Sequence, residues 1–192
     1  MAKTTKLTLH PKFTIGEISP RLYGAFLEPI GTMVNGSMYN PKHPTADSQG
    51  FRQDFIAALR KAGLPALRLP GGNFVSGWEW KDSIGPKEQR KAHLDLAWHQ
   101  YIPNDVGHDE YLQWADKIGT QPMYTIHLGT GTLLDAIHIA DYTNPPGGTY
   151  CSAFRPPYRR APPSGVTTRY PGHAHAGTRP DASGQKAPQA TG

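Results

Sequence analysis

The sequence of 192 residues has a single cysteine, Cys151, which excludes an internal disulfide and a zinc site built from several thiolates. It has no run of 18 apolar residues, the length that a membrane-spanning helix needs. Residues 1–13 also lack the apolar stretch of a signal peptide. We therefore expect a soluble cytoplasmic protein that does not contact a membrane.

The last quarter of the chain lacks the residues that build a hydrophobic core. Residues 145–192 contain no leucine, isoleucine, methionine or tryptophan, but nine prolines and seven glycines. This stretch contains six lysines and arginines but only one acidic residue, Asp181, so it accounts for the whole net charge of +5. Such a composition cannot bury enough apolar surface to fold. We expect a disordered tail over residues 145–192, and the neutral remainder gives no reason to expect a nucleic-acid partner.

Residues 19–144 alternate between predicted strands and helices. Short apolar runs predict strands and helical spacing predicts helices, in the order 21–27, 51–59, 66–69, 109–118, 122–128 and 133–142, beginning with a strand. Gly63 and Gly119 end the first two helices. Residues 6–10 and 13–17 predict two further short strands.

This alternation predicts the α/β class with parallel βαβ units, in either a doubly wound sheet or a (β/α)8 barrel. A barrel needs at least about 200 residues. Three units therefore form only part of a barrel. Because an unclosed barrel exposes a strand edge and apolar faces, we expect aggregation or partial unfolding.

Polar residues follow each of the three predicted strands. Glu28 follows the first, Arg68 and Asn73 lie at the end of the second, and His127 lies at the end of the third. Ligands of parallel α/β folds bind at these strand ends. The simpler alternatives are an ion pair between Glu28 and Arg68, a turn at Asn73 and a hydrogen-bonded core histidine. Four such residues at one end of a sheet together favour a binding site.

The connection that follows the predicted strand at 66–69 is rich in aromatic residues, namely Phe74, Trp78, Trp80, Trp98 and Tyr101. The CH face of a sugar ring stacks on an aromatic face while its hydroxyls form hydrogen bonds. These residues therefore predict a carbohydrate ligand. A hydrophobic lid over the strand ends is the alternative, and we expect structural roles for Trp78 and Trp80.

Signals for a cofactor or metal are weak. The turn at 129–132 is glycine-rich, but Leu134 stands where a dinucleotide fingerprint needs its third glycine. His173 and His175 could bind a metal, but no further ligands accompany them. We expect neither cofactor nor metal. The basic pair Arg159 and Arg160 leaves an RNA-binding tail as a further alternative, against which the sparse charge argues.

Several motifs resemble α-L-arabinofuranosidases of glycoside hydrolase family 51, namely Tyr23–Glu28, His43–Asp47, Arg68–Gly77, Leu94–Trp98 and Leu128–Gly131. The resemblance runs from about residue 6 to about residue 150 and covers only the first part of a family member. It implies a (β/α)8 barrel joined to a jelly-roll β-sandwich. Residues 1–18 would then be sandwich strands, and residues 19–144 an incomplete barrel.

The resemblance also implies an activity and roles for individual residues. Family members remove terminal non-reducing α-L-arabinofuranosyl groups from arabinoxylan or arabinan oligosaccharides in L-arabinose metabolism, without a cofactor, and are often homo-oligomers. By position, Glu28 and Asn73 resemble partners of the sugar hydroxyls, Arg68 a supporter of the nucleophile, and Trp98 a wall near the leaving group. An asparagine usually occupies the position of His127.

The two catalytic glutamates of the family have no counterpart here. The family's acid/base follows an asparagine after barrel strand four and its nucleophile lies on strand seven, but no glutamate follows Glu110 in this sequence. Retaining hydrolysis needs two carboxyl groups about 5 to 5.5 Å apart, so Glu28 alone cannot supply both. Two hypotheses remain, an arabinofuranosidase and an inactive truncated fragment that binds sugars weakly. The change in composition near Cys151 suggests a shift of reading frame there.

Overall fold

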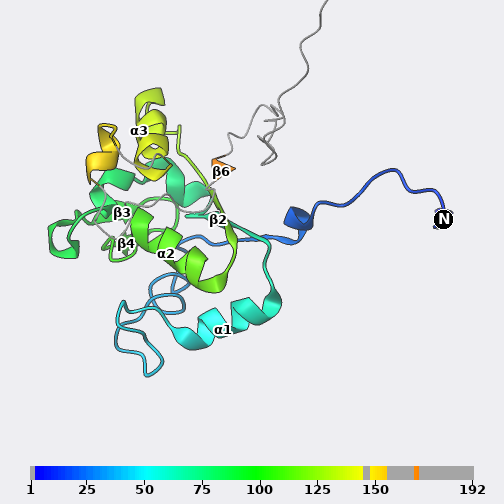
Figure 1. Ribbon diagram of the computed structural model, residues 1–192, viewed down its shortest axis with the longest axis horizontal. Coiled ribbons are helices and arrows are strands. Elements are labelled where there is room, and N and C mark those ends of the chain that lie inside the picture. The colour runs from blue at the N-terminus through cyan, green and yellow to red at the C-terminus, as the bar shows by residue number, and fades with distance from the viewer. Residues whose placement is uncertain (1–2, 145–147, 155–166, 169–192) are drawn as a thin grey trace, which may run out of the picture.

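The computed structural model describes residues 3–144, 148–154 and 167–168. Its centre is a parallel sheet in the order β1-β2-β5-β6 (Figure 1), made of β1 (Ala25–Phe26), β2 (Ala66–Leu69), β5 (Gln121–Tyr124) and β6 (Thr167–Thr168). All three strand pairs are parallel, and the spatial order follows the chain order without a reversal. The predicted α/β class with parallel units is therefore confirmed.

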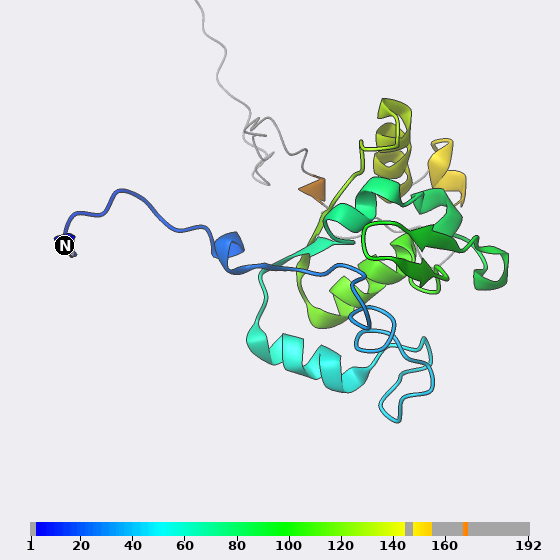
Figure 2. The ribbon, with the colours of Figure 1, turned by 180° about the vertical axis from the view of Figure 1, so that it is seen from behind.

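Three helices connect these strands, α1 (Gln53–Ala62), α2 (His108–Ile118) and α3 (Leu133–Thr143). As predicted, Gly63 and Gly119 end α1 and α2, at φ angles of 65° and 75° that glycine adopts without strain. Figure 2 shows α2 close to the sheet and α1 further out, where it packs on α2. No helix in the described part of the chain is long and apolar enough to cross a membrane.

The sheet has a covered face and an open face. On β2, Leu67 and Leu69 are buried whereas Arg68 between them is exposed, because successive side chains of a strand point to opposite faces. The covered face joins the core, which includes Tyr111, Leu112, Trp114, Tyr124 and Tyr142. On the open face, the strand register places Phe26, Arg68 and Met123 in one row.

The connection from β2 to α2 contains structure that the sequence did not predict. It folds into three 3₁₀ turns, η2 (Asn73–Gly77), η3 (Trp80–Ser83) and η4 (Lys87–Gln89), followed by an antiparallel hairpin of β3 (His93–Asp95) and β4 (Gln100–Ile102). Trp78 and Trp80 are buried in the core, in agreement with the structural roles expected for them. The Trp78 indole donates a hydrogen bond to Oδ1 of Asn104 at 2.9 Å.

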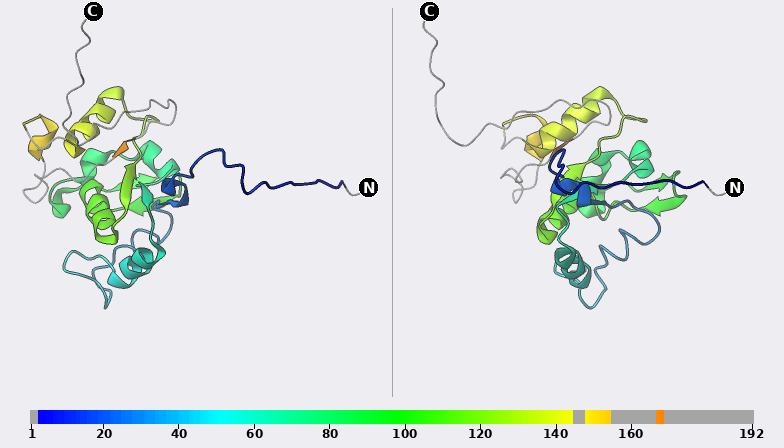
Figure 3. Two further views of the ribbon diagram at one scale, coloured as in Figure 1. Left: turned by 45° about the vertical axis from the view of Figure 1, so that its right-hand side comes forward. Right: turned by 90° about the vertical axis from the view of Figure 1, so that its right-hand side faces the viewer.

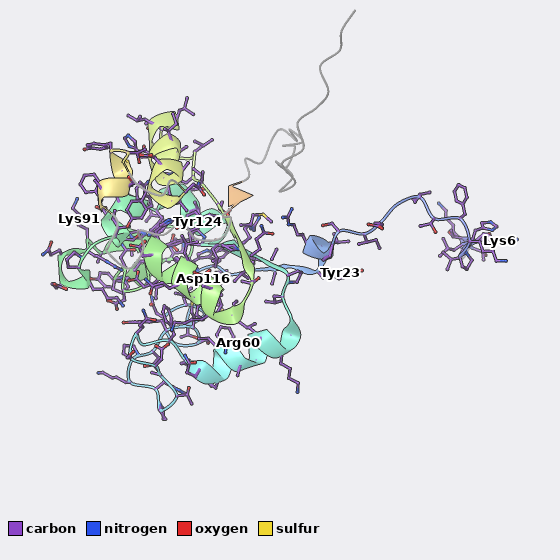
Figure 4. The ribbon with its side chains drawn as sticks, viewed as in Figure 1. Lys6, Tyr23, Arg60, Lys91, Asp116 and Tyr124 are labelled. Carbon is purple, nitrogen blue, oxygen red and sulfur yellow. The ribbon has the colours of Figure 1, made fainter. Side chains whose placement is uncertain are left out.

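The strands expected at 6–10 and 13–17 are not formed. Residues 3–19 run away from the rest of the structure (Figure 3), and among the described residues no strand pairs with them. Figure 4 shows Lys6 far from the body that contains Tyr124. Alternating residues such as Leu7 and Ile15 are 81% and 93% exposed. A strand obtains its hydrogen bonds from a neighbour, so an alternating pattern alone does not form one.

The first strand of the sheet is shorter than predicted. The expected run 21–27 contributes only β1, because Pro20–Tyr23 forms the 3₁₀ turn η1 instead. Likewise, β5 ends at Tyr124, before the predicted end at 128.

Part of the expected disordered tail is structured. The 3₁₀ turn η5 (Cys151–Phe154) packs on α3, with the Cys151 side chain buried and its backbone amide donating to Oδ2 of Asp141 at 2.9 Å. Strand β6 pairs with β5 through Thr167 and Thr168. An average composition misses such segments because a few local contacts suffice to place them. The other residues of 145–192 lie outside the described part of the chain.

A buried ion pair fastens the 3₁₀ region to α2. The two terminal nitrogens of Arg90 donate to the two carboxylate oxygens of Glu110, each at 2.9 Å, and these side chains are only 4% and 9% exposed. Arg90 also donates to the carbonyls of Gly85 and Asn104. Glu110 in turn accepts from the backbone amide of Gly107 at the start of α2. The Arg90 guanidinium thus connects the loops at Gly85 and Asn104 to the first turn of α2.

Replacement of Arg90 by leucine should lower the free energy of unfolding by about 3 to 5 kcal/mol, because it leaves the Glu110 carboxylate buried without its partner. Urea denaturation of the full chain measures this change. The control is Lys91→Leu, which breaks an ion pair with Asp82 whose side chains are 79% and 33% exposed. Its effect should stay below about 1 kcal/mol. Equal effects of the two variants would contradict this view of the buried pair.

Candidate functional site

Glu28 follows β1 and is buried, with 6% of the residue exposed. Leu27 still donates its backbone amide to the carbonyl of Arg68, so Glu28 stands directly at the end of the strand. Its Oε1 accepts two hydrogen bonds, from the Phe74 amide at 2.8 Å and from the Trp98 indole at 3.1 Å. Its Oε2 accepts none from the residues that the structure describes. One oxygen therefore fixes the carboxylate, and the other can accept a hydrogen bond from a ligand.

The turn after β2 packs against this carboxylate. A β-carbon at Gly71 would lie 2.5 Å from Cγ of Glu28, and the φ angle of Gly71 is 142°. A β-carbon at Gly72 would lie 3.3 Å from Oε2 of Glu28. Glycine at these two positions lets the backbone approach the carboxylate. Asn73 follows with an exposed side chain, between two residues that lie against Glu28.

Trp98 reaches Glu28 from the turn between β3 and β4. The hairpin has a second attachment nearby, since the Gln100 side chain donates to the carbonyl of Pro29. Trp98 is 37% exposed, so its ring is partly open to solvent. The structure thus brings Glu28, Asn73 and Trp98 together near the ends of β1 and β2.

Arg68 does not pair with Glu28. Its guanidinium carbon lies 4.8 Å from the ring centre of Phe26, a cation–π arrangement on the open face of the sheet. Within the described ranges, Arg68 makes no ion pair with Glu28, so that simpler interpretation is wrong. An open hollow on this face is lined by Arg21, Gly24, Ala25, Phe26, Ala66, Arg68 and Met123.

His127 belongs to the connection between β5 and α3. Its residue is 9% exposed, and its Nδ1 accepts a hydrogen bond from the Gly131 amide at 3.1 Å. Its Nε2 is buried and has no partner in the described part of the chain. The alternative was a core histidine with both ring nitrogens hydrogen bonded, and among the described residues only one of them is. Neither ring nitrogen bonds to Glu28.

The glycine-rich turn at 129–132 caps α3 and connects two loops. Thr132 and Asp135 form a capping box in which each side chain accepts from the other's backbone amide. Thr130 donates its hydroxyl to the carbonyl of Ser76, which lies in η2 three residues after Asn73. The turn that follows β5 is thereby tied to the turn that follows β2.

Lys81 binds Asp135 and so attaches η3 to the start of α3. The hydrogen bond from the Lys81 ammonium, with those from Thr132, holds the pKa of the Asp135 carboxyl well below its usual range. The same hydrogen bond raises the pKa of Lys81. Both shifts favour the ionised pair.

No group of three metal-binding side chains occurs among the described residues. His173 and His175, the weak metal candidates, lie outside them.

Sequence reasoning missed three parts of this site, the Phe74 amide, the Trp98 indole bond and the Gln100 attachment. A backbone donor has no signature in a sequence. The other two depend on the hairpin, whose strands have three residues each and whose partner Glu28 is 70 residues away. Two signals in the sequence pointed to Trp98, the aromatic residues of 73–101 and the Leu94–Trp98 motif, but neither indicated its bond to Glu28.

Comparison with known protein families and curated sequences identifies relatives. The sequence profile of the family described as "Alpha-L-arabinofuranosidase 1 domain" matches residues 58–144. An intracellular exo-α-(1→5)-L-arabinofuranosidase of Streptomyces lividans is 43% identical over 166 residues, covering 85% of this chain and 25% of that protein. The enzyme 1 of that name from Bacillus subtilis is 39% identical over 166 residues, covering 86% and 33%. The chain thus spans a quarter to a third of these relatives.

Solved structures give the same result. The arabinose complex of an α-L-arabinofuranosidase from Thermotoga maritima matches with a TM-score of 0.75 and 41% identity, over 80% of this chain and 32% of that one. A family 51 α-L-arabinofuranosidase from Bifidobacterium longum matches with a TM-score of 0.76 and 39% identity, over 80% and 30%.

The similarity extends further than its motifs indicated. Because 85% of 192 residues is about 163, the match to the Streptomyces lividans protein must reach at least about residue 163. We expected sequence unrelated to the family from Cys151 onward. This expectation does not hold for residues 151 to about 163.

Replacement of Gly71 by alanine should push the Glu28 carboxylate out of place and destabilise the fold. Gly63→Ala is the matched control, because Gly63 also has a positive φ angle but nothing within 4 Å of an added β-carbon. The control should cost about 1 to 2 kcal/mol from backbone strain alone. We expect Gly71→Ala to cost clearly more by urea denaturation. A smaller loss than in the control would mean that Gly71 does not need to approach Glu28.

The low pKa of Asp135 predicts a pH-dependent contribution to stability. A carboxyl group with a folded-state pKa below its unfolded value of about 3.9 stabilises the fold above that pH and loses this effect as the pH falls. The unfolding free energies of the wild type and Asp135→Asn should therefore differ at pH 6 and converge towards pH 2.5. Urea titrations at both pH values test this. A difference independent of pH would refute it.

Proposed function

We propose that this chain, which is similar to family 51 α-L-arabinofuranosidases over a quarter to a third of their length, contains the arabinose-recognition part of such an enzyme. The single observation that carries the proposal is the buried Glu28 carboxylate beside Asn73 and Trp98, whose Oε2 accepts no hydrogen bond from the described residues. A sugar hydroxyl donates to this oxygen. The Asn73 amide can both donate and accept, and the partly open indole of Trp98 offers a flat face to the sugar.

The arrangement of the sheet supports the assignment to a barrel. A doubly wound sheet reverses its strand order at the switch point, whereas the order β1-β2-β5-β6 follows the chain throughout. We infer that residues 19–144 and β6 are consecutive units of a (β/α)8 barrel, whose inner face carries Arg68. Residues 3–19 are exposed and form no strand among the described residues, and we propose that in a whole enzyme of this kind they would pair within an accompanying β-sandwich.

We assign binding but not bond cleavage to the residues of this sequence. In the proposed barrel, β6 is the fourth strand, after which the family places its acid/base glutamate. The residues that follow Thr168 contain no glutamate, and Asp181 is their only acidic residue. Glu28 is the only carboxylate among the candidate residues at the ends of β1, β2 and β5, and retaining hydrolysis needs two.

The names of the relatives suggest the ligand and the location. Those from Streptomyces lividans and Bacillus subtilis are named intracellular exo-α-(1→5)-L-arabinofuranosidases. We propose that this chain binds the terminal α-L-arabinofuranosyl group of α-1,5-linked arabino-oligosaccharides inside the cell. Recognition needs no cofactor, because hydroxyl groups, one carboxylate and an aromatic face suffice.

The test is titration of the chain with 4-nitrophenyl α-L-arabinofuranoside by calorimetry, with wild type, Glu28→Gln and Glu88→Gln compared. Glutamine can keep both hydrogen bonds that Oε1 accepts and replaces Oε2 with an amide donor. A hydrogen bond to a charged group is worth about 1.5 to 3 kcal/mol, so binding should weaken about 10- to 100-fold. Glu88 is exposed on η4, so its variant should bind like the wild type.

Equal binding by Glu28→Gln and wild type would remove Glu28 from the site. Release of 4-nitrophenol is measured in the same samples, and we expect none. Turnover by the wild type that Glu28→Gln abolishes would favour the second candidate function, a complete arabinofuranosidase.

A further inference from the structure

The turn that carries Trp98 is formed by residues 96–99 of the β3–β4 hairpin (Figure 1), between the last paired residues of the two strands, Asp95 and Gln100. Within this turn His99 has a positive φ angle of 51°, which residues other than glycine seldom adopt. Among the described residues, no hydrogen bond between two backbone groups involves residues 96–99. The conformation of the turn therefore depends on side chains.

The Asp95 side chain supplies a hydrogen bond to this turn. Its Oδ1 accepts from the backbone amide of Ala97 at 3.0 Å, the arrangement by which aspartate holds a turn two residues further on. Asp95 is only 4% exposed, and its Oδ2 is buried without a partner among the described residues. Burial of a carboxylate with an unpaired oxygen costs free energy. Such a loss of stability is typical of residues that are kept for function.

Asp95 lies on the face of the hairpin that packs against the candidate site. Successive side chains of a strand point to opposite faces, so His93 and Asp95 share one face, while Leu94 between them is exposed. The centre of the His93 ring lies 5.9 Å from that of Phe74. Phe74 in turn donates its backbone amide to Glu28. The face that carries Asp95 thus contacts a residue that binds the Glu28 carboxylate.

Trp98 directly follows the residue whose amide Asp95 binds, and its indole donates to Oε1 of Glu28 at 3.1 Å. We propose that Asp95 is a positioning residue for Trp98. Its hydrogen bond to Ala97 fixes the turn in the conformation that directs the indole towards Glu28. The expected effect on sugar binding rests on the proposed function, whereas the expected effect on the indole hydrogen bond does not.

The experiment records the indole N–H signals of the full ¹⁵N-labelled chain by NMR, for the wild type, Asp95→Ala and Asp95→Asn. Trp98→Phe assigns the Trp98 signal. Asp95→Ala removes the acceptor for Ala97, so the Trp98 signal should move towards that of a free indole and exchange faster with water. Asparagine keeps an oxygen acceptor, so Asp95→Asn should retain the wild-type signal.

An internal reference and a matched control separate this effect from a general loss of stability. The Trp78 indole, which donates to Asn104, should not shift in any variant. Asp47 also accepts from an amide two residues further on, that of Gln49 at 2.9 Å, but in the loop before α1. Asp47→Ala should therefore lower stability without moving the Trp98 signal.

Three results would overturn the proposal. They are an unchanged Trp98 signal in Asp95→Ala, an equal shift in Asp47→Ala, and a signal in Asp95→Asn that matches Asp95→Ala. If Asp95→Ala does not fold, hydrogen exchange in the wild type decides. The Ala97 amide and the Trp98 indole should then be protected to a similar degree, because opening of the turn releases both. An indole that stays protected while the amide exchanges freely would contradict the proposal.

The same variants are titrated with 4-nitrophenyl α-L-arabinofuranoside by calorimetry. Asp95→Ala should weaken binding about 3- to 10-fold, the equivalent of one hydrogen bond, and Asp95→Asn should bind like the wild type. No binding by the wild type would overturn the proposed function, while the NMR signals would still decide whether Asp95 positions Trp98. Binding by the wild type that Asp95→Ala leaves unchanged would remove Asp95 from the support of the sugar site.

Discussion

One carboxylate oxygen joins the three segments from which the candidate site is built. Oε1 of Glu28 accepts from the backbone amide of Phe74 and from the indole of Trp98, and so binds the end of β1 to the turn after β2 and to the β3–β4 hairpin. Because the group is buried, these two donors replace the water that would otherwise solvate it. Its second oxygen, Oε2, accepts no hydrogen bond from the described residues.

The polar contacts beneath this site form a frame that does not depend on the ligand. Arg90 and Glu110 hold the 3₁₀ region to α2, while Lys81 and Asp135 hold it to α3. The first pair is buried and the second is partly exposed, so they contribute differently to stability. Together they fix the long connection between β2 and α2, which otherwise contains only short turns and one small hairpin.

The proposed function separates recognition from bond cleavage. A binding site needs one carboxylate, an amide and an aromatic face at neighbouring strand ends, and Glu28, Asn73 and Trp98 meet there. Retaining cleavage needs a second carboxyl group at a defined distance. The open face of the sheet, with Phe26 and Arg68 exposed, shows that the described strands have one covered side only.

Local patterns in the amino-acid sequence account for the elements that depend on a few neighbouring residues. Helical spacing and the glycines at 63 and 119 predicted α1 and α2, and the position after a strand singled out Glu28 and Asn73. Only the tertiary structure decided that residues 6–17 form no strand, that η5 packs on α3, and that Trp98 bonds to Glu28. Local signals act over a few residues, whereas a strand partner or a hydrogen bond across 70 residues exists only once the chain has folded.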